Sequence, residues 1–213
     1  MLKKSTLFIE SGVASHPLPG ENQIGDTYII EPFSNGVLIA AADGLGHGEE
    51  AEKAATVCAT VLKMYAGQPV ENIVRFCHKA LLKTRGVVLS LASFSSLDNT
   101  MTWLGVGNVE GTLIRLESQN KRTSAQEVKI TRESLLLRSG VVGYQLPSLR
   151  PAAIQLKQND TLIFATDGIH NTFTEGLAIM NQSPQNIAEQ ILAKHFKGTD
   201  DALVLVARWR NTA

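Results

Sequence analysis

The chain has 213 residues, enough to bury a substantial core, and we expect a single domain over residues 1–213. Hydrophobic residues make up 44% and charged residues 19%, which excludes a mainly disordered or disulfide-scaffold protein. The 20 Lys and Arg residues balance the 20 Asp and Glu residues, and this zero net charge argues against nucleic-acid binding as the main function.

The first half of the chain predicts strands followed by a pair of helices. Runs rich in β-branched or continuous apolar residues predict strands, and a Pro- and Gly-rich run predicts a loop. The strands cover residues 6–13, 27–30 and 36–42, and the loop covers residues 16–22. Apolar residues then recur at i, i+3 and i+4 spacing over 51–65 and again over 70–81. Two amphipathic helices in succession can cover one face of a sheet.

The second half returns to strands and ends with a helix and a strand. The expected strands cover residues 87–94, 101–106, 109–116, 161–166 and 202–209, with one or two more within 128–137 and a loop over 121–126. Ser183 and Pro184 suit an N-cap and a first helical position, which predicts a helix that stops at Gly198. Strand runs interrupted by paired helices favour an α+β layered sandwich over an alternating fold.

The sequence carries no pattern of a membrane span or an exported leader. No apolar segment approaches the ~20 residues that a helix needs to cross a bilayer, and Glu10 follows the N-terminus too soon for a signal peptide. We therefore expect a cytoplasmic protein that binds no membrane. Cys58 and Cys77 lie on apolar faces of the expected helices, which predicts reduced packing residues and no zinc site.

Four aspartates stand at comparable places in the predicted strands. Asp43 and Asp167 each follow an apolar strand and precede a glycine, whereas Asp26 and Asp200 each open a strand. In an antiparallel sheet the end of one strand lies beside the start of its neighbour. The four carboxylates can therefore meet at one edge.

Carboxylates gathered in this way repel one another unless a cation neutralises them. Oxygen ligands select Mg²⁺ or Mn²⁺, so a hard divalent ion is the simplest partner. Gly44 and Gly48 would let a backbone group approach such an ion or a phosphate closely. The alternative is that these Asp-Gly pairs are ordinary turns, that Asp200 merely starts a surface strand, and that the glycines only connect a strand to a helix.

Several segments together resemble a known enzyme family. They are Gly25-Asp26, Ala41-Ala42-Asp43-Gly44-Leu45-Gly46-His47-Gly48, Ala165-Thr166-Asp167-Gly168-Ile169 and Asp200-Asp201. In this order they resemble the metal-dependent serine/threonine protein phosphatases of the PPM type, in their SpoIIE-like branch. Shorter matches at residues 83–86, 105–109 and 139–143 resemble the small stressosome phosphatases of the RsbX type.

The resemblance implies a four-layer αββα sandwich whose two central antiparallel sheets hold two Mn²⁺ or Mg²⁺ ions. Its implied ligands are Asp43 for both ions, Asp26 and the Gly44 carbonyl for one, and Asp167 and Asp200 for the other. Paired ions of this kind activate water to attack phosphorus and neutralise the phosphoryl oxygens, so that no phosphoenzyme is needed. Asp201 is expected behind the ligands.

The implied substrate is phosphoserine or phosphothreonine on a STAS-domain stressosome protein of the RsbS or RsbR kind. Its dephosphorylation would give negative feedback in a stress-signalling pathway. Two alternatives stay open: the client is an anti-anti-sigma factor, or the chain is an inactive module that binds phosphoproteins. The resemblance to small phosphatases makes a monomer the expectation.

A few further side chains are candidates for a functional role. His47 lies four positions after Asp43 in the Gly-rich turn, where it could donate a proton to the leaving serine oxygen; the alternative is an exposed loop histidine. The resemblance implies that larger relatives hold the substrate phosphate with an N-terminal Arg. No Arg precedes Arg75 in this chain, so the phosphate would be held by the metal ions alone or by Lys3 or Lys4. Arg85 is expected to cap the second helix rather than to contact a partner.

Overall fold

Two β-sheets lie face to face in the computed structural model, which describes residues 8–21, 24–118, 128–177, 179 and 181–210. The first sheet has the strand order β1 (Ile9–His16), β11 (Ala202–Trp209), β10 (Thr161–Ala165), β6 (Glu110–Ser118) and β7 (Val128–Ser134). The second has the order β2 (Asp26–Phe33), β3 (Gly36–Gly44), β4 (Val87–Ser95), β5 (Thr100–Val106) and β8 (Leu137–Arg138), and β9 (Ala152–Gln155) also pairs with β5.

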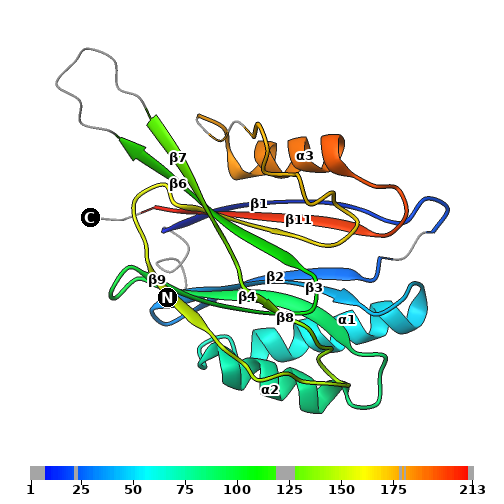
Figure 1. Ribbon diagram of the computed structural model, residues 1–213. Coiled ribbons are helices and arrows are strands. Elements are labelled where there is room, and N and C mark those ends of the chain that lie inside the picture. The colour runs from blue at the N-terminus through cyan, green and yellow to red at the C-terminus, as the bar shows by residue number, and fades with distance from the viewer. Residues whose placement is uncertain (1–7, 22–23, 119–127, 178, 180, 211–213) are drawn as a thin grey trace.

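Helices cover the outer faces of both sheets. Helices α1 (Glu49–Met64) and α2 (Val70–Leu81) pack on the second sheet, and α3 (Pro184–His195) packs on the first (Figure 1). The order of layers is therefore α3, first sheet, second sheet, and then α1 with α2. This arrangement confirms the four-layer αββα sandwich that the resemblance implies.

Each of the three interfaces between layers has its own hydrophobic cluster. Phe94, Trp103 and Trp209 belong to the cluster between the two sheets, where each is at most 2% exposed. Cys58 and Cys77 lie buried and unpaired in the cluster between α1, α2 and the second sheet, as expected of packing residues. The third cluster joins α3 to the first sheet. Burial of this apolar surface is the main force that holds the layers together.

A local signal sets the start of α3 as predicted. The Ser183 hydroxyl accepts a hydrogen bond from the backbone N–H of Asn186 at 3.1 Å, which caps α3. Helix α1 begins after Gly48 without a side-chain cap. Its first turn carries acidic residues, whose negative charges interact favourably with the positive end of the helix dipole. Among the described residues, no helix combines the length and the apolar character needed to span a bilayer.

The structure differs from the predicted elements in several places. Strand β1 extends to His16, where a loop was expected. Residues 6 and 7 of the predicted strand lie outside the described residues, as does the predicted loop over 121–126. Strand β9 was not predicted, because it is short and mostly exposed and so lacks an apolar run. The two-residue strand β8 pairs parallel with β5, so the second sheet is not wholly antiparallel.

Candidate metal centre

Asp26 and Asp43 meet because β2 and β3 are antiparallel neighbours. The strand register pairs the two residues directly, at the point where β2 begins and β3 ends. The backbone N–H of Gly44 donates to the carbonyl of Gly25 at 3.1 Å, which extends the pairing by one step. The expected meeting of a strand start with a strand end is thus present in the second sheet.

The other two aspartates lie at the facing edge of the first sheet. Asp167 follows β10 and Asp200 precedes β11, and these two strands are antiparallel neighbours. The Thr166 hydroxyl joins the two sheets, because it donates to Oδ2 of Asp26 at 2.8 Å and accepts from the N–H of Leu203 at 2.8 Å. Both pairs of aspartates therefore lie at the same end of the sandwich.

The carboxylates influence one another electrostatically. Burial, with added repulsion from Asp26, Asp167 and the later aspartates, raises the pKa of Asp43 from 3.8 to about 8. Burial likewise raises the pKa of Asp26 to about 7, although the hydrogen bond from Thr166 opposes this shift. A bound cation would relieve both the desolvation and the repulsion.

The pKa of Asp167 is raised by burial and by the nearby charge of Asp200, against the influence of Lys197 and Asn108. The amide of Asn108 donates to Oδ2 of Asp167 at 2.8 Å, and Lys197 Nζ donates to the carbonyl of Asp167 at 2.6 Å. These two donors hold the segment that carries Asp167 in place.

The donor set fits a hard divalent ion. Carboxylate oxygens of the four aspartates and the carbonyl oxygen of Gly44 are ligands that Mg²⁺ and Mn²⁺ prefer. In the described part of the chain, no three or more His, Cys, Asp or Glu side chains converge at the spacing of a closed metal site. The carboxylates therefore lie at one edge and interact electrostatically, but they are not as close together as the ligands of a bound metal ion.

Asp201 supports the site from behind. Its side chain is buried, and its two oxygens accept hydrogen bonds from the N–H groups of Leu18 at 2.7 Å and Gly25 at 2.6 Å. Both acceptors are thus occupied by the backbone that leads into β2. Asp201 thereby helps to position Asp26, and its place behind metal ligands stays a prediction.

Glycine permits close packing around the two Asp-Gly turns. A Cβ on Gly44 would lie 2.2 Å from the Ala51 carbonyl oxygen, and one on Gly168 would lie 1.9 Å from the Asp201 carbonyl oxygen. Gly48 has φ 75°, a conformation that favours glycine at the start of α1. The structure therefore accounts for Gly44, Gly48 and Gly168 through chain packing and turning.

His47 lies at the surface of the Gly-rich turn. Its Nδ1 is 3.1 Å from Oε1 of Glu21, and its side chain is 70% exposed. Arg85 does not cap α2 as expected, because the Leu81 carbonyl accepts instead from the N–H of Thr84 at 2.9 Å and from its hydroxyl at 2.8 Å. The Arg85 guanidinium lies against Gly46, where a Cβ would be 2.6 Å from Nη1. Lys3 and Lys4 lie outside the described residues.

Sequence reasoning missed three residues that hold the aspartates: Asn108, Thr166 and Lys197. The contact of Asn108 with Asp167 could have been predicted from the strand register. Strands β6 and β10 pair Glu110 with Ala165, and the same register continued two residues further brings Asn108 opposite Asp167. Thr166 and Lys197 act through contacts that only the packed structure defines.

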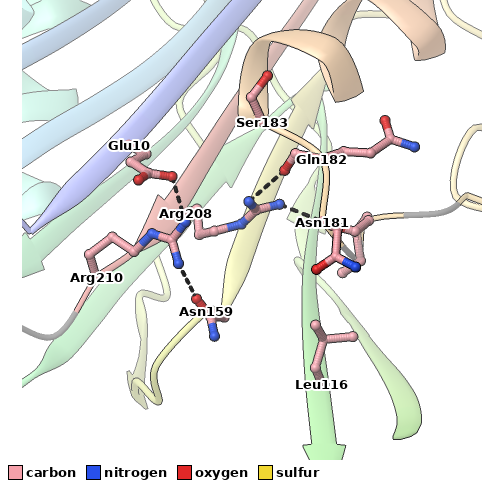
Figure 2. A pocket seen from close by; sticks show the side chains of 9 residues that line it. Glu10, Leu116, Asn159, Asn181, Gln182, Ser183, Arg208 and Arg210 are labelled. Atoms are coloured by element: carbon pink, nitrogen blue, oxygen red, sulfur yellow. Dashed lines mark hydrogen bonds and ion pairs between the residues drawn. The ribbon is translucent and has the colours of Figure 1, made fainter.

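A separate cavity of about 390 Å³ lies at the other end of β11, beside Arg208 and Arg210 (Figure 2). Arg208 lies seven positions after Asp201 along the chain, which corresponds to about 23 Å of strand. Arg208 donates to the carbonyls of Gln182 at 2.6 Å and Ile179 at 3.2 Å, and so fixes the chain before α3. Arg210 bonds to Glu10 at 2.8 Å. These contacts assign the cavity to packing around α3, not to the aspartate site.

Comparisons with known proteins agree with this geometry. A family model described as stage II sporulation protein E (SpoIIE) matches residues 34–210. Phosphoserine phosphatase RsbX of Bacillus subtilis (strain 168) is 29% identical over 90 residues, which are 42% of this chain and 45% of that protein. The match thus spans less than half the length of this curated relative.

Two solved structures resemble the whole fold. One, from work on the bacterial stressosome as a modular system adapted to control secondary messenger signalling, has a TM-score of 0.79 and 26% identity over 94% of this chain and 99% of that chain. The other, RsbX in complex with magnesium, has a TM-score of 0.80 and 21% identity over 95% of this chain and 96% of that chain. With a family match over most of its length and a sandwich of the same kind, the chain belongs to the SpoIIE family of PPM-type phosphatase domains.

Proposed function

We propose that this chain is a metal-dependent protein serine/threonine phosphatase. The observation that carries the proposal is the gathering of four aspartates, in or next to the ends of four strands, at one end of the sandwich, with the pKa values of Asp26 and Asp43 raised to about 7 and about 8. The similarity to RsbX, a phosphoserine phosphatase, supports the same activity.

Two divalent ions, Mn²⁺ or Mg²⁺, would occupy this edge. Asp43 would contact both ions, Asp26 and the Gly44 carbonyl would hold the first, and Asp167 and Asp200 would hold the second. When bound, such ions lower the pKa of water and neutralise the phosphoryl oxygens. The magnesium complex of RsbX supports the choice of a divalent ion.

The surrounding residues orient these ligands. Thr166 fixes Asp26 through its hydroxyl, Asn108 fixes Asp167, and Asp201 holds the backbone before β2. His47, from the turn after Asp43, would give a proton to the serine or threonine oxygen as the phosphoryl group leaves. Its exposed position allows contact with a substrate protein that approaches from solvent.

The proposed clients are phosphorylated STAS-domain proteins of the stressosome, of the RsbS or RsbR kind. The structural relative from the stressosome study and the similarity to RsbX support this choice. Removal of phosphate from such a client in the cytoplasm would reset the stress signal.

Hydrolysis of p-nitrophenyl phosphate and of a phosphoserine peptide, each with and without Mn²⁺, tests the activity. We expect turnover that depends on Mn²⁺ and stops on addition of EDTA. Protein that binds Mn²⁺ but releases no phosphate from either compound would contradict the proposal and favour the phosphoprotein-binding module. A panel of phosphorylated STAS-domain proteins, assayed next, identifies the client.

A further inference from the structure

Two segments that lie side by side in the fold carry cationic but no acidic side chains, although the chain as a whole is neutral. Residues 72–86 and 138–150 contain no Asp or Glu. The same two segments contain six cationic residues: Arg75, Lys79, Lys83, Arg85, Arg138 and Arg150. We call the surface formed by residues 72–86 and 138–150 the basic face. A charge asymmetry of this size in a neutral protein favours a partner of opposite charge.

The two segments form one continuous surface. Val87 and Val142 exchange backbone hydrogen bonds of 2.9 Å in both directions, and the N–H of Gly143 donates to Nδ1 of His78 at 3.0 Å. Gly143 also packs tightly on the end of α2, because a Cβ there would lie 2.7 Å from Cβ of Leu81. Figure 1 shows the yellow-green chain after β8 running alongside α2.

The basic face has a groove and exposed apolar side chains. The groove has a volume of about 370 Å³ and contains no carboxylate among its lining residues, which are Asn72, Arg75, Phe76, His78, Lys79 and Leu146. Beside the junction of Leu81 and Gly143, Leu82 is 60% exposed and Tyr144 is 82% exposed. Aromatic and Arg side chains are enriched at the centres of protein interfaces.

The basic face adjoins the metal centre. Strands β3 and β4 pair Asp43 with Val88, just after the end of the basic segment, and the N–H of Leu45 donates to the carbonyl of Gly86 at 3.1 Å. Arg85 lies against Gly46 in the turn that follows Asp43 and Gly44. A protein bound on this face would therefore present its surface to the edge where the aspartates gather.

We propose that the basic face docks an acidic surface, with apolar residues at its centre, on the phosphorylated protein substrate. This inference rests on the proposed phosphatase function for the identity of the occupant. Lys79 and Lys83 pair with carboxylates of the substrate, and Leu82 and Tyr144 provide apolar contact. Docking raises the local concentration of the phosphorylated residue at the metal centre and selects among phosphoproteins by their charge.

Binding measured in EDTA tests docking apart from catalysis. The probes are two fluorescent phosphoserine peptides of equal length, one with flanking Asp and Glu residues and one with flanking Gln and Ser residues. We expect the wild-type protein to bind the acidic peptide at least about tenfold more tightly, a difference of about 1.4 kcal/mol, and to lose this preference as salt is added. Equal binding of the two peptides would overturn the proposal, whether or not the protein hydrolyses phosphate.

The matched variants locate the effect. K79E/K83E is expected to lose the preference and, with Mn²⁺, to show a raised KM but an unchanged kcat for the acidic peptide, with unaltered hydrolysis of p-nitrophenyl phosphate. K79R/K83R keeps the charges and is expected to behave as wild type. K129E/K194E reverses two exposed cations outside the basic face and is expected to leave the preference intact.

Two outcomes would contradict this assignment. One is a K79E/K83E variant that folds by circular dichroism and still prefers the acidic peptide. The other is binding of phosphatidylglycerol vesicles through Lys79 and Lys83 with no preference between the peptides, which would make the basic face a membrane-binding surface. Loss of phosphatase activity with the peptide preference intact would overturn only the proposed catalytic function.

Discussion

Asp43 lies opposite Asp26 and beside the aspartates of the other sheet, and we propose that it contacts both ions. We expect Asp43→Asn to lose at least one bound ion and to reduce turnover by several orders of magnitude, because the amide removes a negative ligand while it keeps the shape of the side chain. Metal analysis and phosphate-release assays measure the two effects. Asp98→Asn, at an exposed turn outside the site, serves as the control. Near-normal turnover in Asp43→Asn would remove Asp43 from the mechanism.

The raised pKa values predict how pH affects the metal-free protein. The folded state holds protons on Asp26 and Asp43 up to pKa values of about 7 and about 8, whereas the unfolded chain releases them near 3.8. Their contribution to stability is therefore present at low pH and is lost as the pH rises through 8. In EDTA we expect a lower urea midpoint at pH 9 than at pH 6.

Mn²⁺ is expected to reverse this trend, because it binds the deprotonated carboxylates and stabilises the folded state. Urea unfolding at pH 9 with and without Mn²⁺ measures the effect. The Asp26→Asn/Asp43→Asn double variant is expected to show a weaker dependence on pH in EDTA. A metal-free wild-type protein that becomes more stable from pH 6 to pH 9 would contradict the electrostatic account.

The proposed role of His47 predicts a dependence on the leaving group. A serine oxygen needs a proton as it leaves, whereas nitrophenolate is stable without one. We expect His47→Gln to lower kcat by about 100-fold for a phosphoserine peptide and far less for p-nitrophenyl phosphate. Glu21→Gln tests whether the neighbouring carboxylate contributes through His47. Equal losses for both substrates, or none, would leave His47 an exposed loop residue.

At the scale of single residues, the sequence predicts the aspartates better than the groups around them. Asp26 and Asp43 could be placed because strand starts and ends follow from apolar patterns. Thr166 and Lys197 could not, since the bond from Thr166 to Asp26 joins residues 140 positions apart and crosses from one sheet to the other. Arg85 was assigned to a helix cap, but Thr84 occupies that carbonyl through a local contact.

At the scale of elements, the docking of α3 on β1 depends on a glycine. A Cβ on Gly12 would lie 2.2 Å from the backbone nitrogen of Gln185, and the Gln185 side chain bonds to both backbone groups of Val13. We expect Gly12→Ala to cost about 1–3 kcal/mol of the free energy of unfolding through overpacking. Urea unfolding measures the loss.

Gly67→Ala is the matched control, since its nearest neighbours would lie at an ordinary 3.7 Å from the new Cβ. This variant is expected to unfold close to the wild-type midpoint. Equal stability of Gly12→Ala and Gly67→Ala would mean that α3 can shift away from β1 with no loss of free energy of unfolding. The close contact between Gly12 and Gln185 would then not constrain the fold.

Strong periodicity made most elements predictable. The buried strand β3, the paired helices α1 and α2 and the capped helix α3 follow from apolar runs, helical spacing and Ser183. Strand β9 was missed because its register with β5 depends on backbone pairing rather than on an apolar face. Strand β8 pairs parallel with β5 because of the path that the chain takes after β7, and no local sequence pattern indicates that path.

At the scale of the whole molecule, the site exists only where the two sheets meet. The second sheet supplies Asp26 and Asp43, and the first sheet supplies Asp167 and Asp200. The hydrophobic cluster between the sheets, which includes the large and fully buried side chain of Trp209, holds these edges together. Sequence patterns predict most of the strands but not how they divide into two sheets, which the resemblance to a family supplied.

The most direct measurement is a crystal structure of the protein grown with Mn²⁺, with the ions located by anomalous diffraction. We expect two ions at the seam between the sheets, with oxygen ligands from Asp26, Asp43, Asp167 and Asp200 and from the Gly44 carbonyl. Ions bound elsewhere, or none at this seam although the protein hydrolyses phosphoserine, would contradict the account.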